Sequence, residues 1–157
     1  MQTYCFDTSA FLNPFKRYYS FDLFPSFWRG IEERIAAGAI VTSELVRDEL
    51  EQKEDGLCEW LRKQEGLVIP MDDDQQQQAA HIIATFKAWI QPQSSRNNAD
   101  PFVVALAHAG KLVVVSDETG GGHGKPKIPF VCAQLGVKHV SLFDYIRDTR
   151  LRFSTAH

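Results

Sequence analysis

Short apolar runs alternate along the chain with longer stretches in which apolar residues recur at helical spacing. The apolar runs predict strands, and they lie at residues 3–6, 39–41, 67–69, 111–116 and 137–140. The helical spacing predicts helices at residues 24–37, 43–53, 57–63, 75–90, 100–110 and 142–152. This alternation predicts an α/β fold, a three-layer sandwich in which helices flank a mostly parallel central sheet.

In such a sheet, ligands bind in the crevice beyond the carboxyl ends of the strands. The residues that directly follow each strand are therefore the first candidates for chemistry. Asp7 follows the first predicted strand, and Asp117 and Glu118 follow the fourth. An acid at a strand end is most often a turn or cap residue, so each of these alone is a weak signal.

Glu49 lies within the apolar arc of its predicted helix, beside Val46 and Leu50. A carboxylate on a core-facing stripe is costly unless it has a cation, a hydrogen-bonding partner or a wet cleft. Glu49 is therefore a functional acid, or one half of an ion pair with Arg47 or Lys53, or part of a helix face that is only partly buried.

Asp100 precedes Pro101 at the predicted start of a helix, which makes it a candidate N-cap residue. The N-terminus of a helix beside the sheet crevice can also hold a carboxylate next to a metal ion. A structural role and a catalytic role are thus compatible at this position.

Length and composition limit the class of protein. The chain has 157 residues, of which 44% are hydrophobic, and a formal net charge of −3, which predicts one globular domain over residues 1–157. This charge excludes binding to nucleic acid through bulk positive charge alone. No apolar run approaches the ~20 residues that span a bilayer, and the start MQTYCFDTSAF shows no secretory signal. We therefore expect a cytoplasmic protein that binds no membrane.

The acids suit a particular kind of ion. Separated carboxylates without a histidine or cysteine cluster suit Mg²⁺ or Mn²⁺, which prefer oxygen ligands, activate water and stabilise the leaving oxygen of a phosphodiester. Cys5, Cys58 and Cys132 are far apart and match no zinc spacing, so we expect reduced buried thiols. The sequence therefore predicts a metal-dependent nuclease.

Several segments, in order along the chain, together resemble the PIN-domain ribonucleases. They are Asp7-Thr8-Ser9, the Glu-Leu pair within Val46 to Leu50, Asn98-Ala99-Asp100 with Val103-Val104-Ala105, and an acid after Val113-Val114-Val115. Other segments resemble a little-characterised PIN-like branch with toxin–antitoxin (VapC-like) relatives. These are Lys16 to Tyr19 with Phe21-Asp22, Phe27-Trp28, and Lys127 to Pro129 followed by Val131-Cys132.

The resemblance implies a PIN-like fold and an endoribonuclease that cleaves RNA phosphodiesters by metal-activated water. It implies that Asp7, Glu49, Asp100 and a fourth acid hold Mg²⁺ or Mn²⁺, and that the Ser9 hydroxyl hydrogen-bonds within the acidic cluster. Toxin members of the family commonly pair with an antitoxin. The resemblance thus also implies an antitoxin partner, and it makes a homodimer plausible.

The fourth acid is ambiguous in this sequence. The family usually places it two residues after a Ser or Thr that ends the strand, and counting from Ser116 this position is Glu118. Successive strand residues point to opposite sides, so only one of Asp117 and Glu118 is expected to face the metal. We favour Glu118 and keep Asp117 as the second choice.

Two segments are candidates for contacts with the RNA backbone. Residues 15–21 combine Lys16 and Arg17 with aromatic side chains, which suits RNA and equally suits core packing or a subunit interface. Residues 120–127 read GGGHGKPK, contain Lys125 and Lys127, and lack the Walker pattern. This second segment is either an RNA-contacting loop or a solvated linker, and the linker is favoured.

The favoured hypothesis is a metal-dependent endoribonuclease, the toxin of a toxin–antitoxin pair. The main alternative is a catalytically degenerate PIN-like module that binds RNA or a protein partner, which a Glu in place of Asp at the fourth position favours. A phosphatase with Asp7 as nucleophile is a distant third, because it would need an aspartate where Ser9 stands.

Overall fold

The computed structural model describes residues 2–89 and 99–152 of the chain. Its strands form one sheet in the order β3-β2-β1-β4-β5, and all pairs of neighbouring strands are parallel. The strands are β1 (Tyr4–Phe6), β2 (Ile40–Ser43), β3 (Val68–Ile69), β4 (Val113–Val115) and β5 (His139–Val140). The predicted α/β fold with a parallel central sheet is confirmed.

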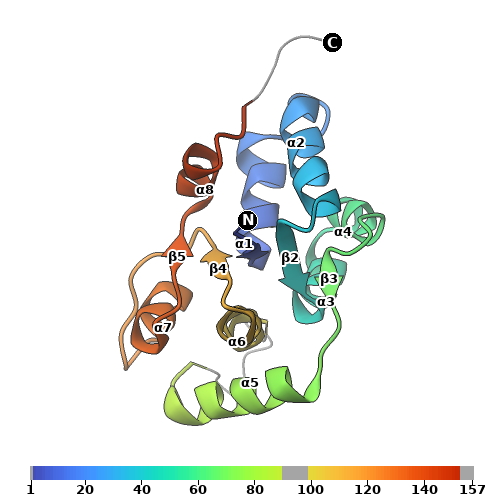
Figure 1. The fold of residues 1–157 in the computed structure, drawn as a ribbon. Helices are drawn as coiled ribbons and strands as arrows, with labels where there is room; N and C mark the ends of the chain where they lie inside the picture. The colour runs from blue at the N-terminus through green and yellow to red at the C-terminus, as the bar shows by residue number, and fades with distance from the viewer. Residues whose placement is uncertain (1, 90–98, 153–157) are drawn as a thin grey trace.

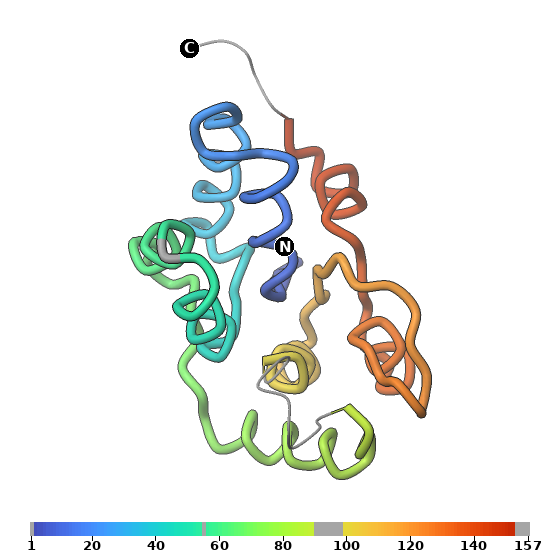
Figure 2. The backbone as a smooth tube through the Cα atoms, turned by 180° about the vertical axis from the view of Figure 1, so that it is seen from behind, coloured from blue at the N-terminus to red at the C-terminus, as the bar shows by residue number. Residues whose placement is uncertain are grey.

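Helices cover both faces of this sheet (Figure 1, and from behind in Figure 2). On one side lie α1 (Thr8–Asn13), the π-helical turn η1 (Pro14–Tyr18), α2 (Pro25–Ala36) and α8 (Leu142–Asp148). On the other side lie α6 (Asp100–Gly110), α7 (Ile128–Leu135) and, outside α6, α5 (Asp73–Thr85). Beyond the β2–β3 edge lie α3 (Glu44–Lys53) and α4 (Asp55–Arg62).

The central strands are buried on both faces, which explains their continuous apolar runs. Phe6, Val114 and Val115 are at most 1% exposed. Phe6 is paired with Val115, so β1 and β4 end at the same level, and the Asp7 N–H donates to the Val115 carbonyl at 2.9 Å. This register brings the acid after β1 next to the acids after β4.

Most aromatic side chains of residues 15–21 pack against the rest of the fold. The ring centroids of Phe15 and Phe21 are 4.9 Å apart, and those of Phe21 and Trp28 are 4.7 Å apart. Most aromatic residues of this segment are therefore explained by packing, because they join η1 and the connection after it to α2. Tyr18 is the exception, at 39% exposed.

The structure contains α1, η1 and α7, which the hydrophobic pattern does not predict. α1 and η1 have six and five residues, too few for a helical period to show. The predicted helix over 142–152 ends at Asp148, because Arg150 adopts a left-handed φ of 56° and the Leu151 N–H donates to the Ile146 carbonyl. The predicted helix over 75–90 ends at Thr85, and Ile90 lies outside the described residues.

Cys5, Cys58 and Cys132 are buried thiols outside any disulfide, as predicted. Burial, with a smaller contribution from the nearby Asp7 and Glu118 carboxylates, raises the pKa of the Cys132 thiol to about 12. Cys132 therefore stays a protonated core residue at neutral pH. Within the described ranges, no helix is both long enough and apolar enough to cross a membrane.

Candidate metal centre

Three carboxylates from distant parts of the chain meet beyond the carboxyl ends of β1 and β4. Asp7 follows β1, Glu118 follows β4 by three residues, and Asp100 is the first residue of α6. One oxygen of each lies within 4.8 Å of the other two. Asp7 and Asp100 are buried and Glu118 is partly buried. We call these three residues the acid cluster.

Asp7 is the N-cap residue of α1, and a serine fixes its orientation. Its Oδ2 accepts from the Ser9 hydroxyl at 2.8 Å and from the Ser9 N–H at 3.3 Å. The Ser9 Oγ in turn accepts from the Asp117 N–H at 3.0 Å. The other oxygen, Oδ1, is buried and has no hydrogen-bond partner among the described residues. The structure thus places Ser9 in contact with the acid cluster.

Asp100 is inside α6, so its prediction as the N-cap residue is wrong. The cap position belongs to Ala99, whose own N–H donates to Glu49 Oε1 at 3.1 Å. The Asp100 side chain is therefore free of a capping role, and its Oδ2 is buried without a hydrogen-bond partner in the described part of the chain. Asn98, the first residue of this motif, lies outside the described residues.

The two candidates for the fourth acid diverge. Glu118 turns to the acid cluster, and its Oε2 accepts from the Ile128 N–H at the start of α7, at 2.9 Å. Asp117 turns away, and its oxygens accept from Asn13 Nδ2 at 3.0 Å and from the Leu142 N–H at 3.4 Å. The structure thus brings Glu118, rather than Asp117, to the other acids.

Glu49 lies next to the acid cluster but outside the three-oxygen group. Its Oε2 accepts from the Thr8 hydroxyl at 2.7 Å, while Oε1 holds the Ala99 N–H. Arg47 pairs with Glu44 and Asp48 instead. The alternative in which Glu49 forms an ion pair with Arg47 or Lys53 is therefore not realised among the described residues.

Burial and mutual repulsion raise the pKa of two members of the acid cluster, Asp7 and Asp100, in the absence of a cation. Burial, and then the Glu118 carboxylate, raise the pKa of Asp7 from 3.8 to about 7. Burial, followed by Asp7, Glu118 and Glu49, raises the pKa of Asp100 to about 10. A divalent cation would relieve both the repulsion and the unpartnered oxygens, so these residues fit Mg²⁺ or Mn²⁺.

The predicted RNA-contacting residues lie outside the acid cluster. Lys16 and Arg17 are exposed on η1, and Lys16 pairs with Glu54 at 3.5 Å. Lys125 is exposed in the segment that joins Glu118 to α7, and Lys127 is the residue before that helix. Their contacts with RNA stay predictions.

Sequence reasoning missed the residues that support the cluster. Thr8 binds Glu49, and Asn13 binds Asp117. Thr8 lies between Asp7 and Ser9, two residues that the sequence already marks as candidates, so its position in this motif could have indicated a role at the site. Asn13 gives no signal in the sequence, because its contact spans 104 positions.

Comparison with known proteins identifies a family and a fold. The family described as "Domain of unknown function (DUF4411)" matches residues 4–153. Curated protein sequences gave no match. Among solved structures, VapBC2 from Rickettsia felis bound to a DNA fragment from its promoter is similar, with a TM-score of 0.56 and 15% identity, over 89% of this chain and 98% of that one.

Two related solved structures show the same similarity. FitAB bound to an IR36 DNA fragment has a TM-score of 0.56 and 14% identity, over 99% of this chain and 100% of that one. FitAcB from Neisseria gonorrhoeae has a TM-score of 0.54 and 16% identity, over 90% of this chain and 99% of that one. The chain therefore belongs to the DUF4411 family, and its fold is PIN-like.

Proposed function

We propose that the chain is a Mg²⁺- or Mn²⁺-dependent endoribonuclease. The observation that carries this proposal is the acid cluster, whose three carboxylates approach within 4.8 Å and leave two buried oxygens without a hydrogen-bond partner among the described residues. Burying such charges together is costly unless a cation offsets them. A PIN-like fold with such a cluster suits hydrolysis of a phosphodiester.

Asp7, Asp100 and Glu118 would hold the metal ion. A bound divalent ion supplies the positive charge that stabilises a phosphodiester as water attacks it. Ser9 orients Asp7 through two hydrogen bonds, and the Ile128 N–H orients Glu118.

Glu49 supports the metal site from outside the acid cluster. Its partners are Thr8, next to Asp7, and the N–H of Ala99, next to Asp100. One carboxylate therefore ties together the chain segments that carry two of the three proposed ligands. Its negative charge also adds to the attraction for a cation.

We further propose that an antitoxin protein restrains this nuclease. The support is the fold, which the chain shares with proteins whose solved structures include VapBC2 and FitAB bound to DNA fragments. Expression of the proposed nuclease alone should inhibit growth of the host cells. Co-expression of the product of a small neighbouring gene should relieve this inhibition if that product is the antitoxin. Co-purification of the two proteins should then give a complex of defined stoichiometry.

Cleavage of total RNA tests the proposed activity. Purified protein should cut RNA with Mn²⁺ present, and EDTA or Asp100→Asn should abolish the cutting. Asp48→Asn, which changes a half-exposed carboxylate on α3, is the matched control and should cut like the wild type. RNA binding without metal-dependent cutting would overturn the nuclease and favour a degenerate binding module.

A further inference from the structure

A surface with exposed rings begins beside the acid cluster. Leu142 is the first residue of α8, and its N–H donates to Asp117, the residue before Glu118. Phe143 comes next and is 50% exposed. Its ring centroid lies 5.6 Å from that of Tyr18 on η1, which is 39% exposed. Two solvent-facing rings thus stand side by side near the proposed catalytic centre.

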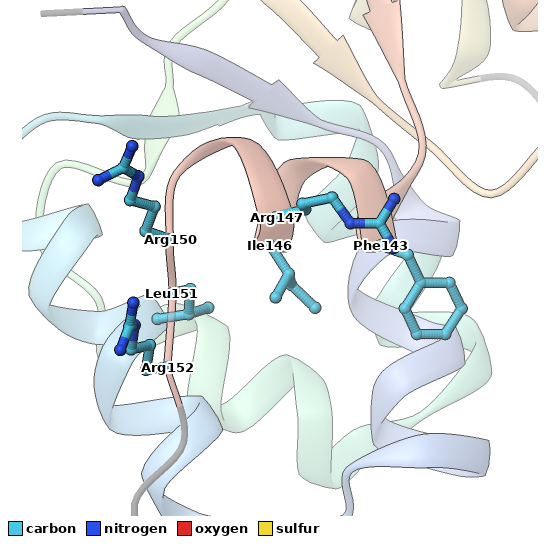
Figure 3. A pocket seen from close by; sticks show the side chains of 6 residues that line it. All are labelled: Phe143, Ile146, Arg147, Arg150, Leu151 and Arg152. Carbon is cyan, nitrogen blue, oxygen red and sulfur yellow. The ribbon is translucent and has the colours of Figure 1, made fainter.

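Arginines continue this surface along α8 and past its end. Arg147 lies four residues after Phe143, on the same helix face. Figure 3 shows Arg150 and Arg152 on the opposite side of a hollow from Phe143. The hollow has a volume of about 450 Å³, and Ile146 and Leu151 complete its lining.

The charge of these arginines is largely available to a ligand. Within the described ranges, Arg147 forms an ion pair only with Asp144, at 4.0 Å, and with side chains 83% and 57% exposed this pair is weak. Arg150 and Arg152 are exposed, and neither forms an ion pair with a residue in the described ranges. Residues 142–152 hold these three arginines and the acids Asp144 and Asp148, which gives this segment a charge of +1 in a chain of net charge −3.

The backbone conformation at Arg150 decides which substitution removes its side chain without disturbing the fold. Arg150 has a φ of 56°, at the position after a helix where glycine is usual because it has no Cβ. An arginine there is less stable than a glycine would be. Lys111 adopts the same conformation after α6, so this geometry assigns no role to Arg150 but makes glycine a replacement that the backbone accepts at both positions.

We propose that Tyr18, Phe143, Arg147, Arg150 and Arg152 form a binding surface for single-stranded RNA that extends from the acid cluster. Exposed rings stack on bases, and arginines bind the phosphates between them. The surface begins at Phe143, whose neighbour Leu142 contacts Asp117, the residue before Glu118 of the acid cluster. The inference rests on the proposed nuclease, for which this surface would hold the substrate.

Binding of a fluorescein-labelled, short single-stranded RNA tests the proposal. All proteins carry Asp100→Asn, so that the RNA is not cut, and fluorescence anisotropy measures affinity at several salt concentrations. The key variant is Arg150→Gly, which removes the side chain and relieves the backbone strain. Its matched control is Lys111→Gly, which removes an exposed lysine with a φ of 55° at the end of α6, on the other side of the sheet (Figure 1).

Arg150→Gly should weaken RNA binding several-fold and lower the salt dependence by about one phosphate contact, a slope change of about 0.7. Phe143→Ala should weaken binding by roughly fivefold or more, through lost stacking. Lys111→Gly should change affinity by less than about twofold, consistent with loss of one distant charge. Because Arg150→Gly should also raise the melting temperature, unfolding cannot explain its weaker binding.

Unchanged RNA affinity in Arg150→Gly and Phe143→Ala would overturn the proposal, as would equal loss in Lys111→Gly. Absence of RNA binding by the Asp100→Asn parent would overturn it too. If Arg150→Gly keeps its RNA affinity and loses only binding to a glutamate-rich peptide, the surface docks an acidic protein, and the proposal is overturned. RNA binding that depends on this surface, in a chain that never cuts RNA, would contradict the nuclease and leave the binding surface standing.

Discussion

Replacing Asp100 with asparagine should stabilise the metal-free protein, although it removes a proposed metal ligand. The raised pKa of about 10 means that the folded protein keeps Asp100 protonated at neutral pH. Holding that proton, relative to an ordinary carboxyl of pKa 3.8, costs about 4 kcal/mol at pH 7. Asparagine is neutral without a proton, so we expect a gain of about 2–4 kcal/mol, or roughly 5–15 °C in melting temperature.

The pH dependence has a definite sign. Both Asp7 and Asp100 have a raised pKa in the folded state, so the folded protein binds more protons than the unfolded chain above pH 3.8. Their contribution to stability is therefore fully present at low pH and falls as pH rises, through about pH 7 for Asp7 and further for Asp100. Asp100→Asn should make this fall shallower.

Urea unfolding in EDTA, followed by circular dichroism between pH 5 and about pH 8, measures both effects. Asp48→Asn, whose carboxylate is half exposed, should stay within about 0.5 kcal/mol of the wild type. A loss of stability in Asp100→Asn, or a pH slope equal to that of the wild type, would refute the reasoning that the acid cluster is strained without a cation.

Four further substitutions test the supports of the acid cluster and the packing of the segment between Glu118 and α7. Ser9→Ala removes the donor to Asp7 and should weaken Mn²⁺ binding by about 10- to 100-fold, measured by calorimetry; unchanged affinity would contradict its positioning role. Thr8→Val leaves Glu49 without a hydroxyl donor and should cost about 1–3 kcal/mol in urea unfolding, and no loss would show that solvent replaces Thr8. Gly121→Ala, with φ 103°, would bring a Cβ within 2.9 Å of the Lys127 backbone, whereas Gly120→Ala, with φ 77°, meets open space. Thermal unfolding should therefore show a larger loss for Gly121→Ala, by about 1 kcal/mol or more, and equal losses would contradict the packing at Gly121.

The parts of the fold that depend on local pattern could be predicted from the sequence. Apolar runs marked the strands, and their ends located Asp7 and Glu118, because in a parallel sheet function gathers at the carboxyl ends. The parallel pairing of β1 with β4, which end at the same level, then brings the two acids together. Prediction succeeded where a structural property, such as the burial of a strand, determines the residue type at several neighbouring positions of the sequence.

The prediction of Asp100 as the N-cap residue of α6 is wrong because Ala99 occupies the cap position, and a carboxylate from α3 accepts its N–H. Glu49 receives the Ala99 N–H across 50 positions, and no local pattern records such a contact. The same limit applies to Asn13 and Asp117, which meet across 104 positions. Supports of a site come from tertiary contacts, so they become visible only in the folded chain.

Calorimetric titration of Mn²⁺ into wild type and Asp7→Asn tests the central claim most directly. Asp7 is chosen because its buried Oδ1 has no hydrogen-bond partner in the described residues and its carboxylate belongs to the acid cluster. The account predicts saturable Mn²⁺ binding to the wild type that weakens as pH falls, since protons compete for the same oxygens, and that is lost in Asp7→Asn. Absence of binding to the wild type, or equal binding to Asp7→Asn, would contradict a metal site at these carboxylates.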